Sequence, residues 1–236
     1  MHFSPYHYSP AEYTTHDPSS RDVAQWLIGA LRSHFSASSD RNLNAIVPVI
    51  EHIGSTALEV AGKGIVDIAL YLSPSLSRAS TSPNLSHSNN GSSVLSSSTI
   101  TSFNTTFENL SHTDKVALIT KELTSLGFAF EHGRGQFKAD RPRLDVSIES
   151  ANKVYKVHCH LLIQCSIEQQ KQRYFRQRLL MSPVLRQQYA HIKQNLISAG
   201  ITEHQEYGLA KSHFVKSILT ELDAHLWSHT KARDGT

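Results

Sequence analysis

Residues that could bind a phosphate group and a metal ion stand close together in the first third of the sequence. Gly54, Ser55 and Thr56 follow an apolar, β-branched run at 47–53 that is typical of a strand. Glycine lets a ligand approach the backbone closely, and the N–H and hydroxyl groups where a helix begins favour phosphate oxygens. Asp67 is the only charged residue of the next apolar run, where a carboxylate needs a metal ion, a cation or hydrogen bonds. The pattern predicts a phosphate cradle followed by a metal ligand, although each feature also occurs for structural reasons alone.

A second candidate group, His158 and His160, stands in an apolar run at 155–163. Side chains alternate along a strand, so the two imidazoles share one face while Cys159 points to the other. The sequence His-Cys-His is therefore not expected to bind a single zinc ion. Paired imidazoles can bind a metal, donate to phosphate, or act as acid and base near neutral pH. The alternative is a pair of half-exposed histidines on an edge strand.

The hydrophobic pattern predicts the elements that must position these residues. Strands are expected at 47–53, 65–72, 127–131, 144–149 and 155–163, and helices at 22–35, 114–126, 166–181, 183–199 and 207–226. The mixture indicates an α+β fold with a helical C-terminal third. Alternation along 144–149 places Asp145 and Glu149 on the polar face of their strand, where either is a candidate second metal ligand, with Asp145 preferred.

One stretch does not fit a folded domain. Residues 73–112 consist mainly of Ser, Thr and Asn with few large apolar side chains, which predicts a disordered insert. The remaining length suits one domain at 21–227. An extended polar lead-in at 1–20 precedes it, and a polar tail at 228–236 follows.

Composition argues against several classes of protein. A net charge of +3 gives no strong sign of nucleic-acid binding. No apolar run approaches the ~20 residues of a membrane span, and the first residues lack the features of a secretory signal. The two cysteines form no disulfide framework, so a cytoplasmic location is expected.

The stretch IEHIGSTALEVAGKGIVDI at 50–68 resembles the signature of the GrpB family, a branch of the nucleotidyltransferase-fold proteins. Further motifs that resemble the family follow in the expected order at 137–140, 157–163, 174–180, 185–196 and 207–219. The signature positions matched are Glu51, His52, Gly54, Ser55, Thr56, Ala57, Lys63 and Asp67. Glu59-Val60 and Gly64 depart from the family pattern, which has Pro-Gly and Pro there.

The resemblance implies a nucleotidyltransferase-like fold, with a small mixed or antiparallel sheet flanked by helices. It also implies magnesium-dependent transfer of a nucleotidyl group from a nucleoside triphosphate to an unknown acceptor, a small molecule or a protein. In that reaction Asp67 would bind the metal, His158 and His160 would act in catalysis, and Lys63 would face the developing negative charge. One hydrated ion can link Asp67 to the histidines only over less than roughly 8 Å.

Phosphate contacts are expected from several further residues. Gly54, Ser55 and Thr56 form the cradle, and Arg134 and Lys138 occupy a region where the family carries a basic residue beside an aromatic strand. Ordinary solvated hairpin charges are the alternative for those two. The resemblance also marks basic positions at Arg173, Arg176 and Lys193, and Lys211 is one more phosphate candidate.

The usual metal motif of nucleotidyltransferases is Asp-x-Asp or Asp-x-Glu, whereas this sequence reads Asp67-Ile68-Ala69. The second carboxylate is thus absent at Ala69, so two other functions stay open beside nucleotidyl transfer. One is a catalytically silent nucleotide-binding or regulatory module, with a link to coenzyme A because similar domains are attached to some dephospho-CoA kinases. The other is a protein-interaction scaffold.

Overall fold

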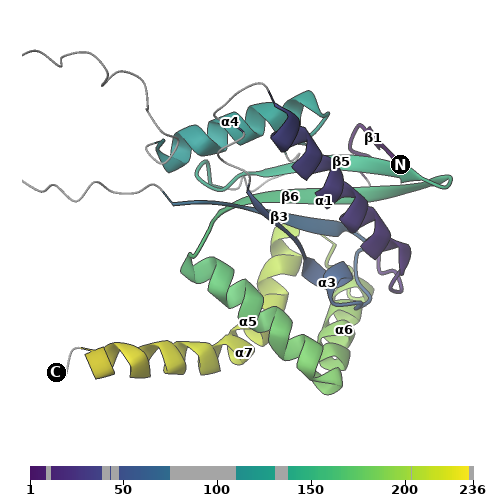
Figure 1. The fold of residues 1–236 in the computed structure, drawn as a ribbon. Coiled ribbons are helices and arrows are strands. Elements are labelled where there is room, and N and C mark those ends of the chain that lie inside the picture. The colour runs from purple at the N-terminus through teal and green to yellow at the C-terminus, as the bar shows by residue number, and fades with distance from the viewer. Residues whose placement is uncertain are drawn as a thin grey trace, which may run out of the picture.

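Two parts of the chain that are far apart in sequence meet in one mixed sheet (Figure 1). The structure is a computed structural model and describes residues 1–8, 12–38, 43, 48–74, 110–130, 138–202 and 204–233. Within these residues the sheet has six strands in the order β1-β5-β6-β3-β2, with β4 also paired to β5. The strands are β1 (His2–Ser4), β2 (Val49–Ile53), β3 (Val66–Leu72), β4 (Ala129–Phe130), β5 (Arg143–Ser150) and β6 (Lys153–Ile163). Only β3 and β6 run parallel to each other, and the other pairs are antiparallel.

Strands β5 and β6 form a hairpin between neighbouring segments of the chain. Ser150 pairs with Lys153 across a two-residue turn, and Ala151 and Asn152 both have positive φ, 49° and 62°. Positive φ at both central residues matches the twist of the two flanking strands. The turn fixes the register, so Asp145 lies opposite His158.

One face of the sheet is closed by α1 (Ser19–Ala37) and α4 (His112–Ser125), which lie across it in Figure 1. Apolar residues at three- and four-residue spacing in both helices pack on alternate residues of the strands. This core includes Leu27, Leu31, Phe35, Ile119, Leu123, Ile68, Leu70, Val146, Cys159 and Leu161, all fully buried. The apolar face of the sheet is therefore fixed by long-range burial rather than by local preference.

The opposite side faces three C-terminal helices, α5 (Ile167–Met181), α6 (Pro183–Ser198) and α7 (His204–Arg233). Ser166 and Ser182 cap the first two by accepting hydrogen bonds from the N–H groups of Gln169 and Leu185. A smaller apolar cluster joins the three helices to the segment after the short helix α3 (Gly54–Ala57). Its buried residues are Leu58, Val60, Leu179, Tyr189 and Ile218.

The predicted α+β class, the mixed sheet and the helical C-terminal third are confirmed. Several predicted boundaries of helices and strands differ from those in the structure. The predicted strand at 127–131 is a two-residue strand, and the helix expected from 114 begins at His112, because the Ser111 side chain accepts from the Asp114 N–H. Most of the predicted insert, residues 75–109, lies outside the described residues. Helix α7 continues to Arg233, through most of the segment expected to be a polar tail.

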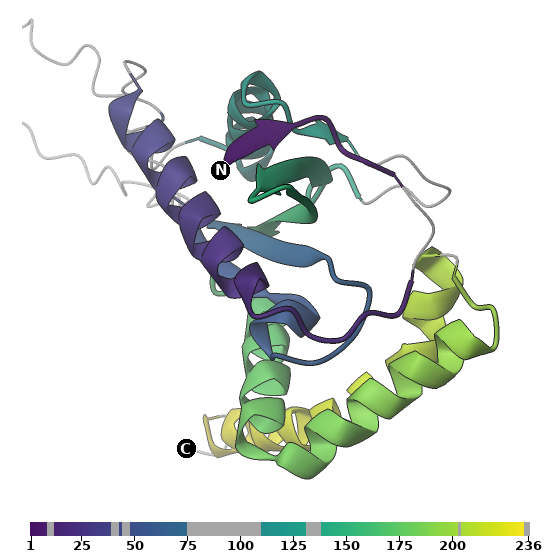
Figure 2. The same ribbon diagram turned by 90° about the vertical axis from the view of Figure 1, so that its right-hand side faces the viewer.

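The N-terminal lead-in contributes to the fold. His2 to Ser4 pair with Glu149 to Ser147, and Thr14 forms a bridge with Gly62. The purple chain that leads into α1 starts beside the C-terminal helices (Figure 2). The Tyr13 hydroxyl donates to the carbonyl of Ala190 in α6 at 3.5 Å. These contacts link the sheet to the C-terminal helices.

No helix in the described part of the chain combines the length and apolar character that crossing a membrane requires.

Truncation of Leu27 tests the packing of α1 on the sheet. Its side chain is fully buried, whereas Gln25 on the same helix is exposed. Leu27→Ala should lower the free energy of unfolding by about 2–5 kcal/mol, since it leaves a cavity in the core. Urea denaturation followed by circular dichroism measures this, with Gln25→Ala as the control expected to change stability by less than about 0.5 kcal/mol. Equal effects of the two variants would contradict the described packing.

Candidate functional site

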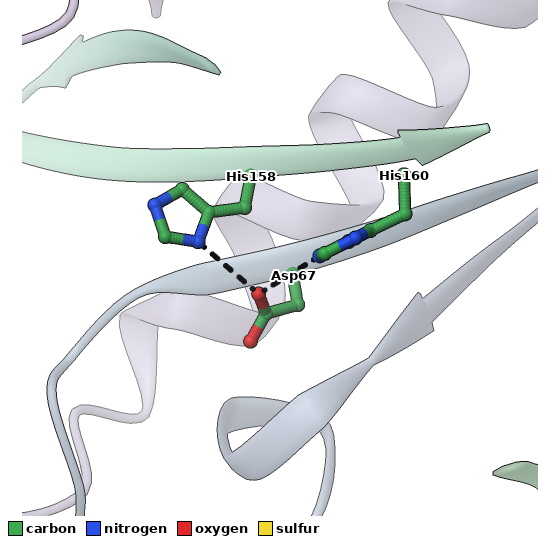
Figure 3. A group of neighbouring side chains, drawn as sticks. All are labelled: Asp67, His158 and His160. Carbon is green, nitrogen blue, oxygen red and sulfur yellow. Dashed lines mark hydrogen bonds and ion pairs between the residues drawn. The ribbon is translucent and has the colours of Figure 1, made fainter. Parts of the chain in front are cut away.

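Three side chains from β3 and β6 converge on one face of the sheet (Figure 3). In the parallel ladder Asp67 lies opposite His158, so their side chains share a face, and His160 follows two residues along. Asp67 Oδ1 lies 3.6 Å from His158 Nδ1 and 3.5 Å from His160 Nε2. One ligand atom from each residue falls within 4.8 Å of the other two. The structure thus brings together the three residues that the sequence suggested, well inside the expected limit.

The electrostatics of this group favour an ionised carboxylate. Burial alone would raise the pKa of Asp67. Hydrogen bonding and charge from His158 and His160 outweigh burial and hold that pKa below its ordinary value. Cys159 points into the core on the opposite face, where burial raises the pKa of its thiol, so it takes no part in the site.

Gly54 connects the predicted phosphate cradle to Asp67. Its φ is +72°, and a Cβ at this position would lie 2.2 Å from Asp67 Oδ2. Only glycine combines the left-handed backbone with such a close approach. The packing fixes one carboxylate oxygen of Asp67 against the backbone and leaves Oδ1 toward the histidines (Figure 3).

Asp145 lies behind His158 rather than beside Asp67. Its two oxygens accept hydrogen bonds of 2.9 Å from Nε and Nη2 of Arg143, and both side chains are buried. Oδ1 of Asp145 lies 4.0 Å from His158 Nε2, the ring nitrogen away from Asp67. The same Nε2 shares a hydrogen bond of 2.9 Å with the Tyr6 hydroxyl. The expectation that Asp145 supplies a second metal ligand is therefore not supported by its position.

A cavity of about 330 Å³ opens beside this group. Lysine side chains from three segments line it. Lys63 Nζ and Lys211 Nζ lie 4.1 and 5.1 Å from the ring centroid of Tyr207, and Lys193 Nζ lies 4.6 Å from that of Tyr189. The arrangement surrounds one carboxylate and two imidazoles with positive charge.

Lys193 is a buried basic residue in the wall of the cavity. Its side chain is only 2% exposed, and Nζ has no hydrogen-bond partner within the described residues. Burial and the charge of Lys211 lower the pKa of Lys193 to about 7, although Asp67 opposes the shift. Burial lowers the pKa of Lys211 as well. A buried ammonium without an acceptor is costly, and an anion in the cavity would relieve that cost.

Of the remaining residues predicted to bind phosphate, some line the cavity and others do not. Ser55 lines the cavity, whereas Thr56 is buried and its hydroxyl is hydrogen-bonded to His52 Nε2 at 2.9 Å. Burial lowers the pKa of His52 to about 4, so this pair is a neutral structural contact. Lys138 is exposed and is not among the cavity-lining residues. Arg134 lies outside the described residues.

Of the other basic positions, Arg173 forms an ion pair with Glu51 and, with Arg176, lines a second cavity of about 200 Å³. Sequence reasoning missed Tyr6, Tyr189 and Tyr207. Tyr6 contacts His158 and the other two line the cavity, and no spacing pattern marks a single tyrosine of a polar segment or of a helix face for such a role.

Substitution of Gly54 tests its packing against Asp67. Gly54→Ala adds both left-handed strain and a clash with Oδ2. Gly200→Ala is a matched control, because Gly200 has φ +79° and no atom within 4 Å of an added Cβ. Urea denaturation should show that Gly54→Ala is less stable than the control by about 1–3 kcal/mol. Equal losses would mean that Asp67 does not pack against Gly54.

Comparison with protein families identifies a relationship for part of this chain. No curated protein matches the sequence. A family model described as GrpB protein matches residues 106–221, which include β5, β6 with both histidines, α5, α6 and part of α7. The match confirms the resemblance over that range, while Gly54 and Asp67 lie outside it, and the β3–β6 ladder joins Asp67 to the matched region. Residues 106–221 of this chain therefore belong to the GrpB family.

Proposed function

We propose that this protein binds a nucleoside triphosphate in the lysine-lined cavity and transfers its nucleotidyl group to an acceptor. The observation that carries the proposal is the buried ammonium of Lys193, which faces the cavity without a hydrogen-bond partner among the described residues. Buried polar groups usually have a hydrogen-bond partner, and a bound anion would supply the acceptor that this ammonium lacks. A phosphate chain has the charge and the oxygen acceptors that three lysines require.

The ligand contacts follow from the positions of the lining residues. Lys63, Lys193 and Lys211 would contact the phosphate oxygens, and the Ser55 hydroxyl lies on the same wall. The second cavity, which shares Gly54 and Tyr189 with the first, has a mostly apolar, aromatic lining. A planar base would fit there chemically, since aromatic side chains stack on any base.

Magnesium would enter this cavity bound to the triphosphate. Mg²⁺ prefers oxygen ligands in octahedral geometry and is usually held by substrate phosphates with one or two carboxylates. Asp67 offers a single carboxylate, and its neighbours His158 and His160 offer nitrogen. The donor set therefore does not fit a resident magnesium ion, and magnesium belongs to the substrate in this proposal.

A second candidate, nucleotide binding without turnover, is favoured by one specific observation. Asp145 is fully engaged with Arg143, and Ala69 leaves no other carboxylate on the site face of β3. Binding and transfer would share the same cavity. They differ only in whether product forms.

Nucleotide binding can be tested by thermal unfolding with ATP, GTP, CTP and UTP, each with and without magnesium. A ligand at tens of times its dissociation constant should stabilise the protein by about 2 kcal/mol. We expect a magnesium-dependent shift that Asp67→Asn abolishes and that Asp140→Asn, an exposed turn variant, retains. Release of pyrophosphate from the bound nucleotide distinguishes transfer from silent binding. The absence of a shift with every nucleotide would remove both candidates.

Lys193→Met should have opposite effects on stability and on binding. Below about pH 7 the unliganded variant should be more stable than wild type by about 1–4 kcal/mol, because a buried charge is replaced by an apolar group. Its affinity for nucleotide should fall about 10–100-fold with the loss of a charged hydrogen-bond donor.

The lowered pKa of Lys193 also predicts how the stability of the protein changes with pH. Since the pKa of Lys193 is lowered to about 7 from 10.5, the unfolded state binds more protons between these values. The stability of the wild type should therefore rise relative to Lys193→Met as pH increases through this range. Urea denaturation at about pH 7 and about pH 9 measures this difference. Lys138→Met, on an exposed lysine, is the control expected to show neither effect.

A further inference from the structure

We infer that Asp67, His158 and His160 form a resident site for a divalent first-row transition metal ion, with its open positions toward the lysine-lined cavity. The inference concerns the protein without nucleotide and does not depend on the proposed transfer reaction. It rests on four features of the described residues: the donor atoms, their separations, the groups behind His158, and the rigidity of the strands.

The donor atoms of Asp67, His158 and His160 favour a divalent transition metal ion. Two imidazole nitrogens and one carboxylate oxygen can meet at one point. Imidazole suits zinc, iron, nickel and copper, whereas magnesium and calcium prefer oxygen ligands. Three protein ligands with one or more open positions are also the usual composition of a catalytic zinc site. The chemistry of these residues thus points away from the magnesium that a nucleotidyltransferase would use.

The separations leave room for an ion between the ligands. Oδ1 of Asp67 lies 3.6 Å from His158 Nδ1 and 3.5 Å from His160 Nε2, longer than a strong hydrogen bond. Ligands bound tetrahedrally at about 2.1 Å from zinc lie roughly 3.4 Å apart. Two of the separations therefore already suit one shared ion. The third pair, the two ring nitrogens, lies within 4.8 Å, and a rotation of one ring would bring these atoms closer together.

Groups behind His158 would hold it in the orientation for metal binding. With Nδ1 directed at the ion, Nε2 carries the hydrogen, and the Tyr6 hydroxyl lies 2.9 Å away to accept it. The carboxylate of Asp145, fixed by Arg143, lies 4.0 Å from the same nitrogen. Metal-binding histidines commonly donate their second N–H to an oxygen in this manner. The buried Arg143–Asp145 pair thus has a role as a support for His158.

The ligands stand on a rigid frame with one accessible side. Asp67 is fixed by the β3–β6 ladder and by its contact with Gly54. The His158 side chain is 7% exposed, whereas those of Asp67 and His160 are 24% and 20% exposed. All three line the cavity that holds Lys193 and Lys211. A water molecule or a ligand oxygen would therefore complete the coordination from the cavity side.

The test is a metal titration of the full-length protein after removal of bound metal with a chelator. Zn²⁺ affinity is measured by competition with a metal-binding dye, and Co²⁺ is added as a spectroscopic probe of nitrogen and oxygen coordination. We expect one ion per chain, no displacement by millimolar Mg²⁺, and at least about 10-fold weaker binding in His160→Gln and in Asp67→Asn. Tyr6→Phe, which alters only the support of His158, should weaken binding about 10-fold.

Controls separate this site from incidental binding, since the chain has fifteen histidines and an exposed Cys165. All variants are made in a Cys165→Ser background, and His191→Gln, an exposed histidine of α6, should bind Zn²⁺ like its parent. Thermal unfolding without metal checks that each variant folds. If His160→Gln is unstable, the isosteric Asp67→Asn makes the same test.

Three results would overturn the inference: no stoichiometric binding of Zn²⁺ or Co²⁺, equal affinity in wild type and both ligand variants, or displacement of the ion by Mg²⁺. Because the titration contains no nucleotide, its failure leaves the nucleotide proposal intact. Conversely, a protein that binds no nucleotide can still bind the metal.

Discussion

The parallel pairing of β3 with β6 is the constraint on which the site depends. It places Asp67 opposite His158, brings it to His160, 93 residues later in the chain, and sets the three side chains on one face. A shift of one residue would turn the Asp67 carboxylate into the core and an apolar residue into the cavity. Ile68, Leu70, Cys159 and Leu161 prevent such a shift, since all four are fully buried under α1 and α4. The hydrophobic core thus determines the geometry of a polar site that lies on the other side of the sheet.

The sheet therefore separates two different environments. Under α1 and α4 the packing is mainly apolar, and the buried Lys115 of α4 donates hydrogen bonds to Ser73. Toward α5, α6 and α7 the protein buries charged groups, some with partners, such as Arg143 with Asp145, and one, Lys193, without a hydrogen bond in the described structure. Proteins usually lack such unsatisfied groups, and those that persist tend to mark functional sites. The side of the sheet that carries this unsatisfied lysine is the side where a ligand would bind in the proposed function.

Much of this arrangement could be predicted from sequence, because side chains alternate along a strand and their spacing shows which of them share a face. The lone charge of an apolar run identified Asp67, and the two-residue period placed His158 and His160 together and Cys159 apart. Alternation also put Asp145 on the correct face, but the prediction overlooked Arg143, two residues earlier on the same face, which takes up its carboxylate.

Other features depend on tertiary packing and have no local signal. The burial of Lys193 is set by how α6 approaches α7 and the segment near Gly62, and the sequence around a helical lysine does not report that. Tyr6 reaches His158 only because the first strand pairs with β5. Residues 69–105 separate the signature at 50–68 from the family match at 106–221, so sequence comparison alone does not join Asp67 to its histidines.

The register of β3 and β6 gives a physical reason for the absence of a second carboxylate at position 69. Ala69 lies on the site face of β3, directly opposite His160 of β6. An acidic side chain at position 69 would stand beside Asp67 and compete with the imidazole for the same space. Here the small alanine leaves that space to His160, whose Nε2 reaches Oδ1 of Asp67. A nitrogen donor thus stands where a second oxygen donor would be expected, and ion preference follows the donor. In the proposed metal site, an imidazole in place of an acid would therefore favour a transition metal ion over magnesium.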